Sequence, residues 1–248
     1  MTPRSASRSN SDLTIFCDLD GPLIDVSRRY YKTYRLAIVE TVYYYQAQGI
    51  TLQLLPVEQD RFWHMKLERI PDRDIAARTG FRGAQIDVFL DTVRRLVNQP
   101  IMLQEDRLQT WAVEALESLT QAGASLYLVT LRERQQAMQS LKRFGIYHYF
   151  TEVYGTDDEF SAYDNYVECK AVMLSRLMES LRLSSGDEVW MIGDTEADIL
   201  SAKSLGIPAI ALSCGMRSSE YLRRLEPAHV FRDLSQAAHQ VIYGAAAA

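Results

Sequence analysis

The sequence has little cysteine, no long apolar run and no excess of basic residues, and each shortage argues against a class of protein. Its 248 residues include 3 cysteines, Cys17, Cys169 and Cys214, whose wide spacing matches neither a zinc site nor a disulfide framework. We therefore expect free thiols and a cytoplasmic protein. No apolar stretch approaches the roughly 18 residues of a bilayer-spanning helix, so we expect no membrane partner. A net charge of −5 gives no reason to expect a nucleic-acid partner.

The composition is otherwise that of a globular protein. Hydrophobic residues make up 47% of the chain and charged residues 24%, both ordinary values. This length allows one large domain or a core that carries a smaller inserted domain. The first residues contain arginine and serine but no acid and no amphipathic apolar face. We expect residues 1–11 to form a disordered tail.

An apolar run near the start leads directly into two carboxylates and a turn. The residues from Leu13 to Cys17 are typical of a buried strand in a parallel sheet, and the segment Asp18-Leu19-Asp20-Gly21-Pro22 follows them. Because strand side chains alternate between faces, we expect Asp18 and Asp20 to point to the same side. Two acids placed in this way repel each other unless a cation lies between them or one of them carries a proton. The segment therefore predicts a divalent cation or an acid/base pair.

The next part of the chain is expected to be entirely helical. Apolar residues recur at helical spacing in four segments, 27–49, 57–69, 72–78 and 84–97. No strand is expected between Pro22 and Pro100. We predict that residues 23–99 form a helical cap domain, inserted into a core domain made of residues 12–22 and 100–244.

Helices and strands alternate in the remainder of the chain. We expect strands at 125–131, 149–154, 188–192, 208–212 and 229–231, and helices at 106–121, 133–144, 165–181, 196–205 and 235–242. This alternation predicts the α/β class, with a Rossmann-like parallel sheet and helices on both faces. The apolar opening strand must join this sheet, so the helical block is an insertion over the carboxyl ends of the strands. Ligands bind at that edge of open α/β sheets.

Polar residues stand at the ends of several of the expected strands, where a parallel sheet gathers them at one edge. A lysine on a neighbouring helix has a stem long enough to reach the same edge. Three or more carboxylates with a lysine and a threonine suit a magnesium ion and a phosphate, because magnesium prefers hard oxygen ligands. The set is Asp18, Asp20, Thr130, Lys170, Asp194 and Asp198.

Taken in order, these motifs resemble those of the haloacid dehalogenase superfamily of phosphotransferases. The matching segments are Asp18-Leu19-Asp20-Gly21, Thr130 at a strand end, Lys170, and Gly193-Asp194 with Asp198. The resemblance covers residues 13–231, and the helical insertion stands where that family carries a helical cap. The spacing from Lys170 to Asp194 resembles that of the phosphoglycolate-phosphatase-like branch.

The resemblance implies a magnesium-dependent hydrolase of a small phosphorylated metabolite, such as phosphoglycolate or a sugar phosphate. Asp18 would be the nucleophile that forms an aspartyl-phosphate, and Asp20 would be the general acid and base. Thr130 and Lys170 would bind the phosphate. Magnesium would be held by Asp18, by the backbone carbonyl of Asp20 and by Asp194, with Asp198 as a direct or outer partner.

Some alternatives stay open at this point. Pro22 stands where the family usually has threonine, and Leu131 stands where asparagine is common. A phosphomutase would share every core residue, whereas a haloacid dehalogenase has no use for a general acid at Asp20. A non-catalytic binding or regulatory protein could retain the fold. The oligomeric state is not predicted.

Basic residues within the expected cap have two interpretations. Lys66, Arg69 and Arg73 flank a break at Ile70-Pro71 and could reach an anionic substrate. We favour a solvated charged face for all three, because surface charges seldom have a specific role.

Overall fold

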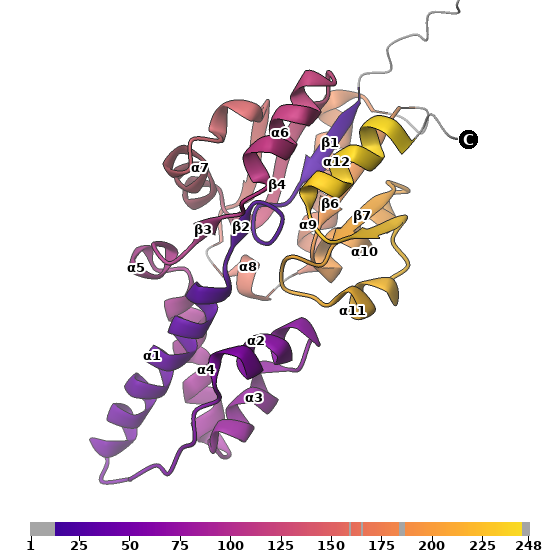
Figure 1. The fold of residues 1–248 in the computed structure, drawn as a ribbon. Coiled ribbons are helices and arrows are strands. Elements are labelled where there is room, and N and C mark those ends of the chain that lie inside the picture. The colour runs from indigo at the N-terminus through magenta and orange to yellow at the C-terminus, as the bar shows by residue number, and fades with distance from the viewer. Residues whose placement is uncertain (1–12, 159, 165, 184–186, 245–248) are drawn as a thin grey trace, which may run out of the picture.

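The computed structural model describes residues 13–244 except 159, 165 and 184–186. The tail expected at residues 1–11 lies outside the described residues. Figure 1 shows an α/β part, which holds the strands, and a helical part that projects from one side of it. None of the described helices is long and apolar enough to cross a membrane.

The α/β part is built on a six-stranded sheet in which every neighbouring pair is parallel. From one edge to the other the strands are β5 (Glu152–Thr156), β4 (Ser125–Glu133), β1 (Thr14–Cys17), β6 (Val189–Gly193), β7 (Ala209–Leu212) and β8 (His229–Phe231). The opening strand thus lies inside the sheet, paired with β4 and β6. The α/β class and the parallel sheet expected from the sequence are confirmed.

The side chains of β1 alternate between two apolar layers. Ile15 and Cys17 belong to the layer that contains α6 (Ala112–Gln121), α7 (Arg134–Arg143) and α12 (Leu234–Tyr243). Phe16 belongs to the layer that contains α9 (Val167–Leu181) and α10 (Glu196–Ser204). All three side chains are buried. Helices therefore cover both faces of the sheet (Figure 1), which is why this strand has no polar face.

The helical part lies between β1 and β4 in the sequence. Its helices are α1 (Ser27–Gln46), α2 (Gln59–Leu67), α3 (Asp72–Thr79) and α4 (Ala84–Val97). Aromatic rings hold them together: Phe89 stacks on Phe81 with ring centroids 4.7 Å apart and meets Tyr34 edge-on at 6.0 Å. These three rings are almost fully buried. The expected helices are confirmed, and their apolar residues form one continuous cluster with those on one face of the sheet.

Two short strands connect the helical part to the sheet, and they correct two expectations. β2 (Ile24–Asp25) pairs antiparallel with β3 (Arg107–Leu108). The expectation of no strand between Pro22 and Pro100 is therefore wrong at β2, and the helix expected over 106–121 begins only at Ala112. The β2–β3 ladder has only two residues in each strand, which is too few to produce an alternating apolar and polar pattern in the sequence. It joins the segments that enter and leave the helical part.

Other differences from the expected elements are small. The strand expected at 149–154 lies further on, because a 3-10 turn occupies Tyr147–Tyr149 and β5 begins at Glu152. β4 continues to Glu133, two residues past the expected end. The short helices α5 (Pro100–Leu103), α8 (Ser161–Asp164) and α11 (Ser219–Arg223) were not expected, since a single helical turn carries little periodicity.

We predict that Phe89→Ala lowers the free energy of unfolding by about 3–5 kcal/mol, because it removes a buried ring and leaves a cavity between Phe81 and Tyr34. Urea denaturation followed by circular dichroism measures this change. Tyr43→Ala is the matched control: its ring is 67% exposed on α1, and we expect a change within about 0.5 kcal/mol. Equal effects of the two substitutions would contradict a packed core in the helical part.

Candidate active site

The candidate site lies where the strand order of the sheet reverses. From β1 the chain proceeds to β4 and β5 on one side, and afterwards to β6, β7 and β8 on the other. The crevice at such a point, outside the carboxyl ends of the strands, is where α/β sheets bind ligands. Asp18 directly follows β1, and Asp194 directly follows the neighbouring β6. Topology thus brings these two acids together from positions far apart in the sequence.

A pocket at this edge contains most of the residues predicted from the sequence. From the α/β part it is lined by Asp18, Asp20, Thr130 and Lys170, and helical-part residues close its other side. β1 ends at Cys17, one residue before Asp18, so strand alternation does not align the two acids as expected. Both nevertheless line the same pocket.

Asp18 forms a buried ion pair with Lys170. The lysine lies in the first turn of α9, and its Nζ is 2.9 Å from Asp18 Oδ1. Burial raises the pKa of Asp18 to about 7, although the Lys170 ammonium opposes this change. Burial lowers the pKa of Lys170, but Asp18 and Asp198 outweigh it and raise that pKa above its usual range. The lysine therefore carries a full charge beside the carboxylate.

Asp198 organises the loop that follows β6. Its Oδ2 accepts hydrogen bonds from the backbone N of Asp194 at 3.1 Å and from the backbone N and Oγ1 of Thr195 at 2.9 and 2.8 Å. Its Oδ1 pairs with Lys170. Thr195 and Asp198 also form a capping box at the start of α10. Both oxygens of Asp198 are thus engaged in fixing the loop and the lysine.

The acids around Asp194 fit a divalent cation. Asp18, Asp194 and Asp198 each offer an oxygen, and these atoms lie within 4.8 Å of one another. Asp194 Oδ2 accepts a hydrogen bond from the backbone N of Met216 at 2.6 Å, whereas Oδ1 is buried with no hydrogen-bond partner among the described residues. Burial, followed by repulsion from Asp198 and Asp18, raises the pKa of Asp194 well above its usual range. A hard cation bound to these oxygens would relieve that repulsion.

Two glycines leave room for the Asp194 carboxylate. A Cβ atom at Gly215 would lie 1.9 Å from Asp194 Oδ2, and one at Gly21 would lie 2.3 Å from Asp194 Cγ. Gly21 also has a φ of +96°, which residues with side chains rarely adopt. The backbone therefore encloses this carboxylate from two directions, which suits a site that must hold a ligand atom in place.

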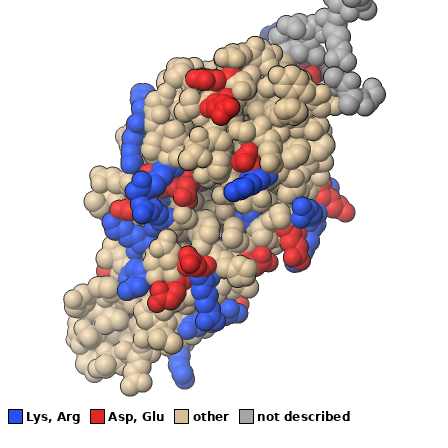
Figure 2. Space-filling view, viewed as in Figure 1, with Lys and Arg blue, Asp and Glu red and all other residues tan. Residues whose placement is uncertain are grey.

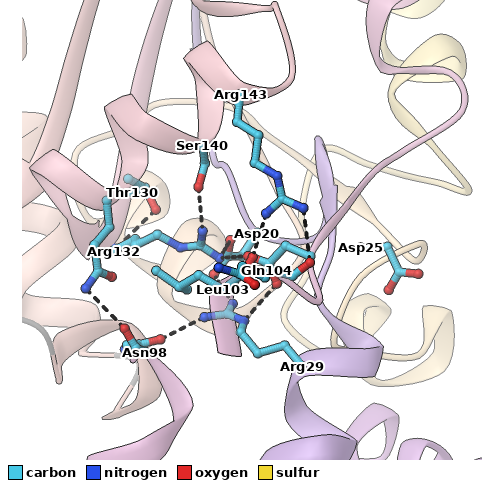
Figure 3. A network of polar contacts seen from close by, with 12 residues as sticks. Asp20, Asp25, Arg29, Asn98, Leu103, Gln104, Thr130, Arg132, Ser140 and Arg143 are labelled. Atoms are coloured by element: carbon cyan, nitrogen blue, oxygen red, sulfur yellow. Dashed lines mark hydrogen bonds and ion pairs between the residues drawn. The ribbon is translucent and has the colours of Figure 1, made fainter. Parts of the chain in front are cut away.

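The surroundings of Asp20 include two arginines that the sequence analysis missed. Arg132 Nη2 lies 2.6 Å from Asp20 Oδ1, and Arg29 Nη2 lies 2.9 Å from Asp20 Oδ2 (Figure 3). Burial raises the pKa of Asp20, but the two guanidinium groups outweigh it and hold the pKa below its usual range. Arg132 stands two residues after Thr130 on β4, so strand alternation could have identified it. Arg29 is one of several arginines in the sequence of its helix region, and no pattern distinguishes it.

Thr130 and the two positions that depart from the expected pattern, Leu131 and Pro22, have defined surroundings. Thr130 is buried, and its Oγ1 accepts a hydrogen bond from the backbone N of Arg132 at 3.2 Å. Leu131 lines the pocket beside it. The carbonyl of Pro22 accepts a hydrogen bond from Trp111 Nε1 at 3.3 Å. The turn after Asp20 is thus tied to the chain just before α6.

Helical-part residues close the pocket; a solvated face is the wrong interpretation for Lys66, whereas Arg69 keeps a side chain that is 46% exposed. Lys66 is only 9% exposed, and its Nζ lies 2.7 Å from Asp72. Arg69 reaches across to Glu196 at the start of α10, at 2.5 Å, and Arg217 binds the same carboxylate at 2.8 Å. Burial raises the pKa of Glu196, but Arg217 and Arg69 bring it down to about 2.

Arg73, by contrast, is exposed as expected and pairs with Asp87 at 2.5 Å. Figure 2 shows that many of the charged side chains on this face gather where the two parts of the molecule meet. Lys66 and Arg69 are buried or paired there because they lie at that junction and not on the outer surface of the helical part.

Comparison with known proteins agrees with this geometry. Pyrophosphatase PpaX of Halalkalibacterium halodurans is 25% identical over 223 residues, which cover 89% of this chain and 93% of the relative. A phosphoglycolate phosphatase of Vibrio vulnificus is 33% identical over 132 residues, and that match spans 53% of this chain and 55% of the relative.

Solved structures share the fold. A haloacid dehalogenase-like hydrolase from Streptococcus pneumoniae superposes with a TM-score of 0.68 at 22% identity, covering 92% of this chain and 97% of its own. A haloacid dehalogenase-superfamily hydrolase from Geobacter sulfurreducens gives 0.62 at 17% identity, covering 96% and 100%. The model of the haloacid dehalogenase-like hydrolase family matches residues 15–212, a range that includes Asp18, Asp20, Thr130, Lys170, Asp194 and Asp198. The chain therefore belongs to the haloacid dehalogenase-like hydrolase family.

Proposed function

We propose that this protein is a magnesium-dependent phosphatase that hydrolyses a small phosphate monoester through an aspartyl-phosphate on Asp18. One observation carries the proposal: the Asp18 carboxylate is buried 2.9 Å from the Lys170 ammonium and beside the acidic oxygens of Asp194 and Asp198. A nucleophilic oxygen, a fixed positive charge and a set of cation ligands thus meet at one point. Phosphoryl transfer chiefly requires such positioning and charge neutralisation.

Asp18 supplies the nucleophile. One of its oxygens forms a bond to phosphorus while the bond from phosphorus to the leaving oxygen breaks, which gives an aspartyl-phosphate. Lys170 balances charge on the carboxylate and on the phosphoryl oxygens, and the Thr130 hydroxyl donates a hydrogen bond to one of those oxygens. Water then attacks phosphorus and releases Asp18 as a carboxylate.

Asp20 moves the proton in both halves of the reaction. It protonates the leaving oxygen in the first half and accepts a proton from the attacking water in the second. The two arginines at its carboxylate stabilise the charged form that accepts the proton. A bound phosphate dianion has the opposite effect on Asp20. Its negative charge raises the pKa of the carboxyl group and favours the protonated form, which donates the proton.

Magnesium would be held by Asp18, by the backbone carbonyl of Asp20 and by Asp194. It would supply a positive charge against the phosphoryl oxygens and against the carboxylates that otherwise repel one another. The unpartnered Oδ1 of Asp194 suits a direct ligand. Asp198, whose two oxygens already have partners, suits an outer role in which it orients the loop and Lys170.

Residues 23–99 act in this proposal as a cap over the pocket. Tyr30, Lys66, Arg69 and Asp72 extend the pocket lining from that segment, so the substrate is enclosed between the two parts. An enclosed, polar and strongly charged pocket favours a small metabolite over a phosphoprotein. Phosphoglycolate and sugar phosphates are candidates, and the relative named pyrophosphatase adds inorganic pyrophosphate to the compounds that deserve a test.

The test is phosphate release from a panel of these compounds, with Mg²⁺ and with a chelator. We expect turnover that depends on Mg²⁺ and that falls by at least about 10³-fold in Asp18→Asn, because the amide cannot form the aspartyl-phosphate. Asp87→Asn is the control, since this carboxylate is 59% exposed on α4 and pairs with the exposed Arg73. Turnover that survives chelation or Asp18→Asn would refute the mechanism. A panel without any turnover would favour a binding protein that retains the fold.

A second prediction concerns the metal site alone. Gly215→Ala places a Cβ against the Asp194 carboxylate, so we expect the Kd for Mg²⁺ to rise by about 10–100-fold. Titration calorimetry with Mg²⁺ measures this change without any substrate. Ser213→Ala is the control in the same loop, because its hydroxyl faces the backbone carbonyl of Phe231 and not the acids. An unchanged Kd in Gly215→Ala, with the fold intact by circular dichroism, would exclude Asp194 as a ligand.

A further inference from the structure

The Asp20 carboxylate is held at both of its oxygens. Arg132 donates to Oδ1 and Arg29 donates to Oδ2, so each oxygen has its own charged donor (Figure 3). Hydrogen bonds between charged groups are stronger and more directional than neutral ones. Two such hydrogen bonds, one from each arginine, fix both the position of the Asp20 carboxylate and the orientation of its plane.

Asp106 closes the arrangement into a frame of four side chains. Its Oδ1 lies 2.9 Å from Arg29 Nε, and its Oδ2 lies 2.8 Å from Arg132 Nη2. The frame contains two cations and two anions, and Arg29, Arg132 and Asp106 are at most 1% exposed. Removing one member of a buried charged set leaves its partners uncompensated. The four side chains therefore hold one another in place.

Two further side chains anchor the arginines. Arg29 Nη1 donates to Asn98 Oδ1 at 2.7 Å, and Arg132 Nη1 donates to Ser140 Oγ at 3.0 Å. Arg29 lies in the first turn of α1 and Asn98 directly follows α4, whereas Arg132 belongs to β4 of the sheet. The frame thus connects both ends of the helical part to the strand that carries Thr130.

We propose that Arg29 is a positioning residue for proton transfer, which holds the Asp20 carboxyl, through the frame with Asp106 and Arg132, in the orientation that serves the leaving group. This inference rests on the proposed function, in which Asp20 is the acid and base. As the bond from phosphorus to the leaving oxygen breaks, its electron pair stays on that oxygen and the Asp20 proton moves to it. The Asp20 carboxylate that results is the group that both guanidiniums bind.

The dependence of rate on the leaving group tests this role. An alkyl phosphate needs a proton on its leaving oxygen, whereas p-nitrophenyl phosphate releases a stable anion without one. The value of kcat/KM reports the step in which the leaving group departs. For Arg29→Gln we expect kcat/KM for the alkyl ester to fall by at least about tenfold more than kcat/KM for the aryl ester. General damage to the fold or to phosphate binding would lower both values alike.

Two companion variants separate positioning from stability. Arg29→Gln leaves Asp106 with one cation fewer, so we pair it with the double variant Arg29→Gln/Asp106→Asn, which removes one cation and one anion from the frame. We expect this charge-balanced variant to keep the fold and to show the same selective loss. Arg29→Lys retains the charge but lacks the planar fork that reaches both acids, so we expect it to recover only part of the loss.

The matched control is Lys32→Gln. Lys32 lies on the same helix and pairs with Glu105, the neighbour of Asp106, at 2.6 Å, but its side chain is 51% exposed. We expect it to leave the ratio of the two kcat/KM values unchanged. Asp20→Asn sets the full size of the selective loss.

An unchanged ratio in Asp20→Asn would overturn the acid role of Asp20, and the inference about Arg29 with it. A selective loss in Asp20→Asn that is absent from Arg29→Gln and from the double variant would overturn the inference alone. So would a gain on the alkyl ester, because it would mean that the frame holds Asp20 away from the leaving group.

Discussion

Repulsion among buried carboxylates is the constraint on which this site depends. Asp18, Asp194 and Asp198 offer oxygens within 4.8 Å of one another at the carboxyl edge of the sheet, where water cannot screen them. Lys170 pairs with Asp18 and Asp198, and the backbone N of Met216 donates a hydrogen bond to the third acid, Asp194. The arrangement keeps a buried oxygen of Asp194 without a partner among the described residues. In the proposed function, such a site gives up stability for the capacity to bind a cation and a phosphate.

The fold makes this repulsion possible because the strand order reverses at β1. At this point the connections from neighbouring strands lead to opposite sides, so a crevice remains between the strand ends. Asp18 after β1 and Asp194 after β6 meet in this crevice. Tyr30, Lys66, Arg69 and Asp72 of the helical part line the pocket at the same crevice. A salt bridge from Arg69 to Glu196, and a hydrogen bond from the backbone N of Ser218 to the carbonyl of Leu67 at 2.9 Å, hold the two parts together in this structure. Sheet topology brings the acids together, and residues of the helical part close the pocket beside them.

The sequence predicts what periodicity and strand ends encode, and little beyond that. The sheet, its parallel direction and the convergence of Asp18 with Asp194 follow from apolar runs that end in polar residues, and the approach of Lys170 follows from its long stem on a neighbouring helix. The β2–β3 ladder and the contact of Arg29 with Asp20 could not be derived in the same way. Arg29 and Asp106 are 77 residues apart and meet only because the helical part returns to its starting point. Such contacts depend on the path of the chain and leave no local pattern.

Asp18 and Asp20 are two residues apart, yet their surroundings give them opposite charge balances. Asp18 belongs to a cluster rich in acids, and burial with this repulsion raises its pKa to about 7. Asp20 belongs to a frame in which two arginines balance two acids, and its pKa is lowered. A raised pKa by itself is typical of a general acid, which would reverse the proposed roles. A bound cation would invert that logic, because it would lower the pKa of the carboxylates that ligate it, whereas the Asp20 carboxylate is bound by Arg29 and Arg132. The proposed division of roles therefore rests on which acid could share a cation with Asp194 and which acid already has two charged partners.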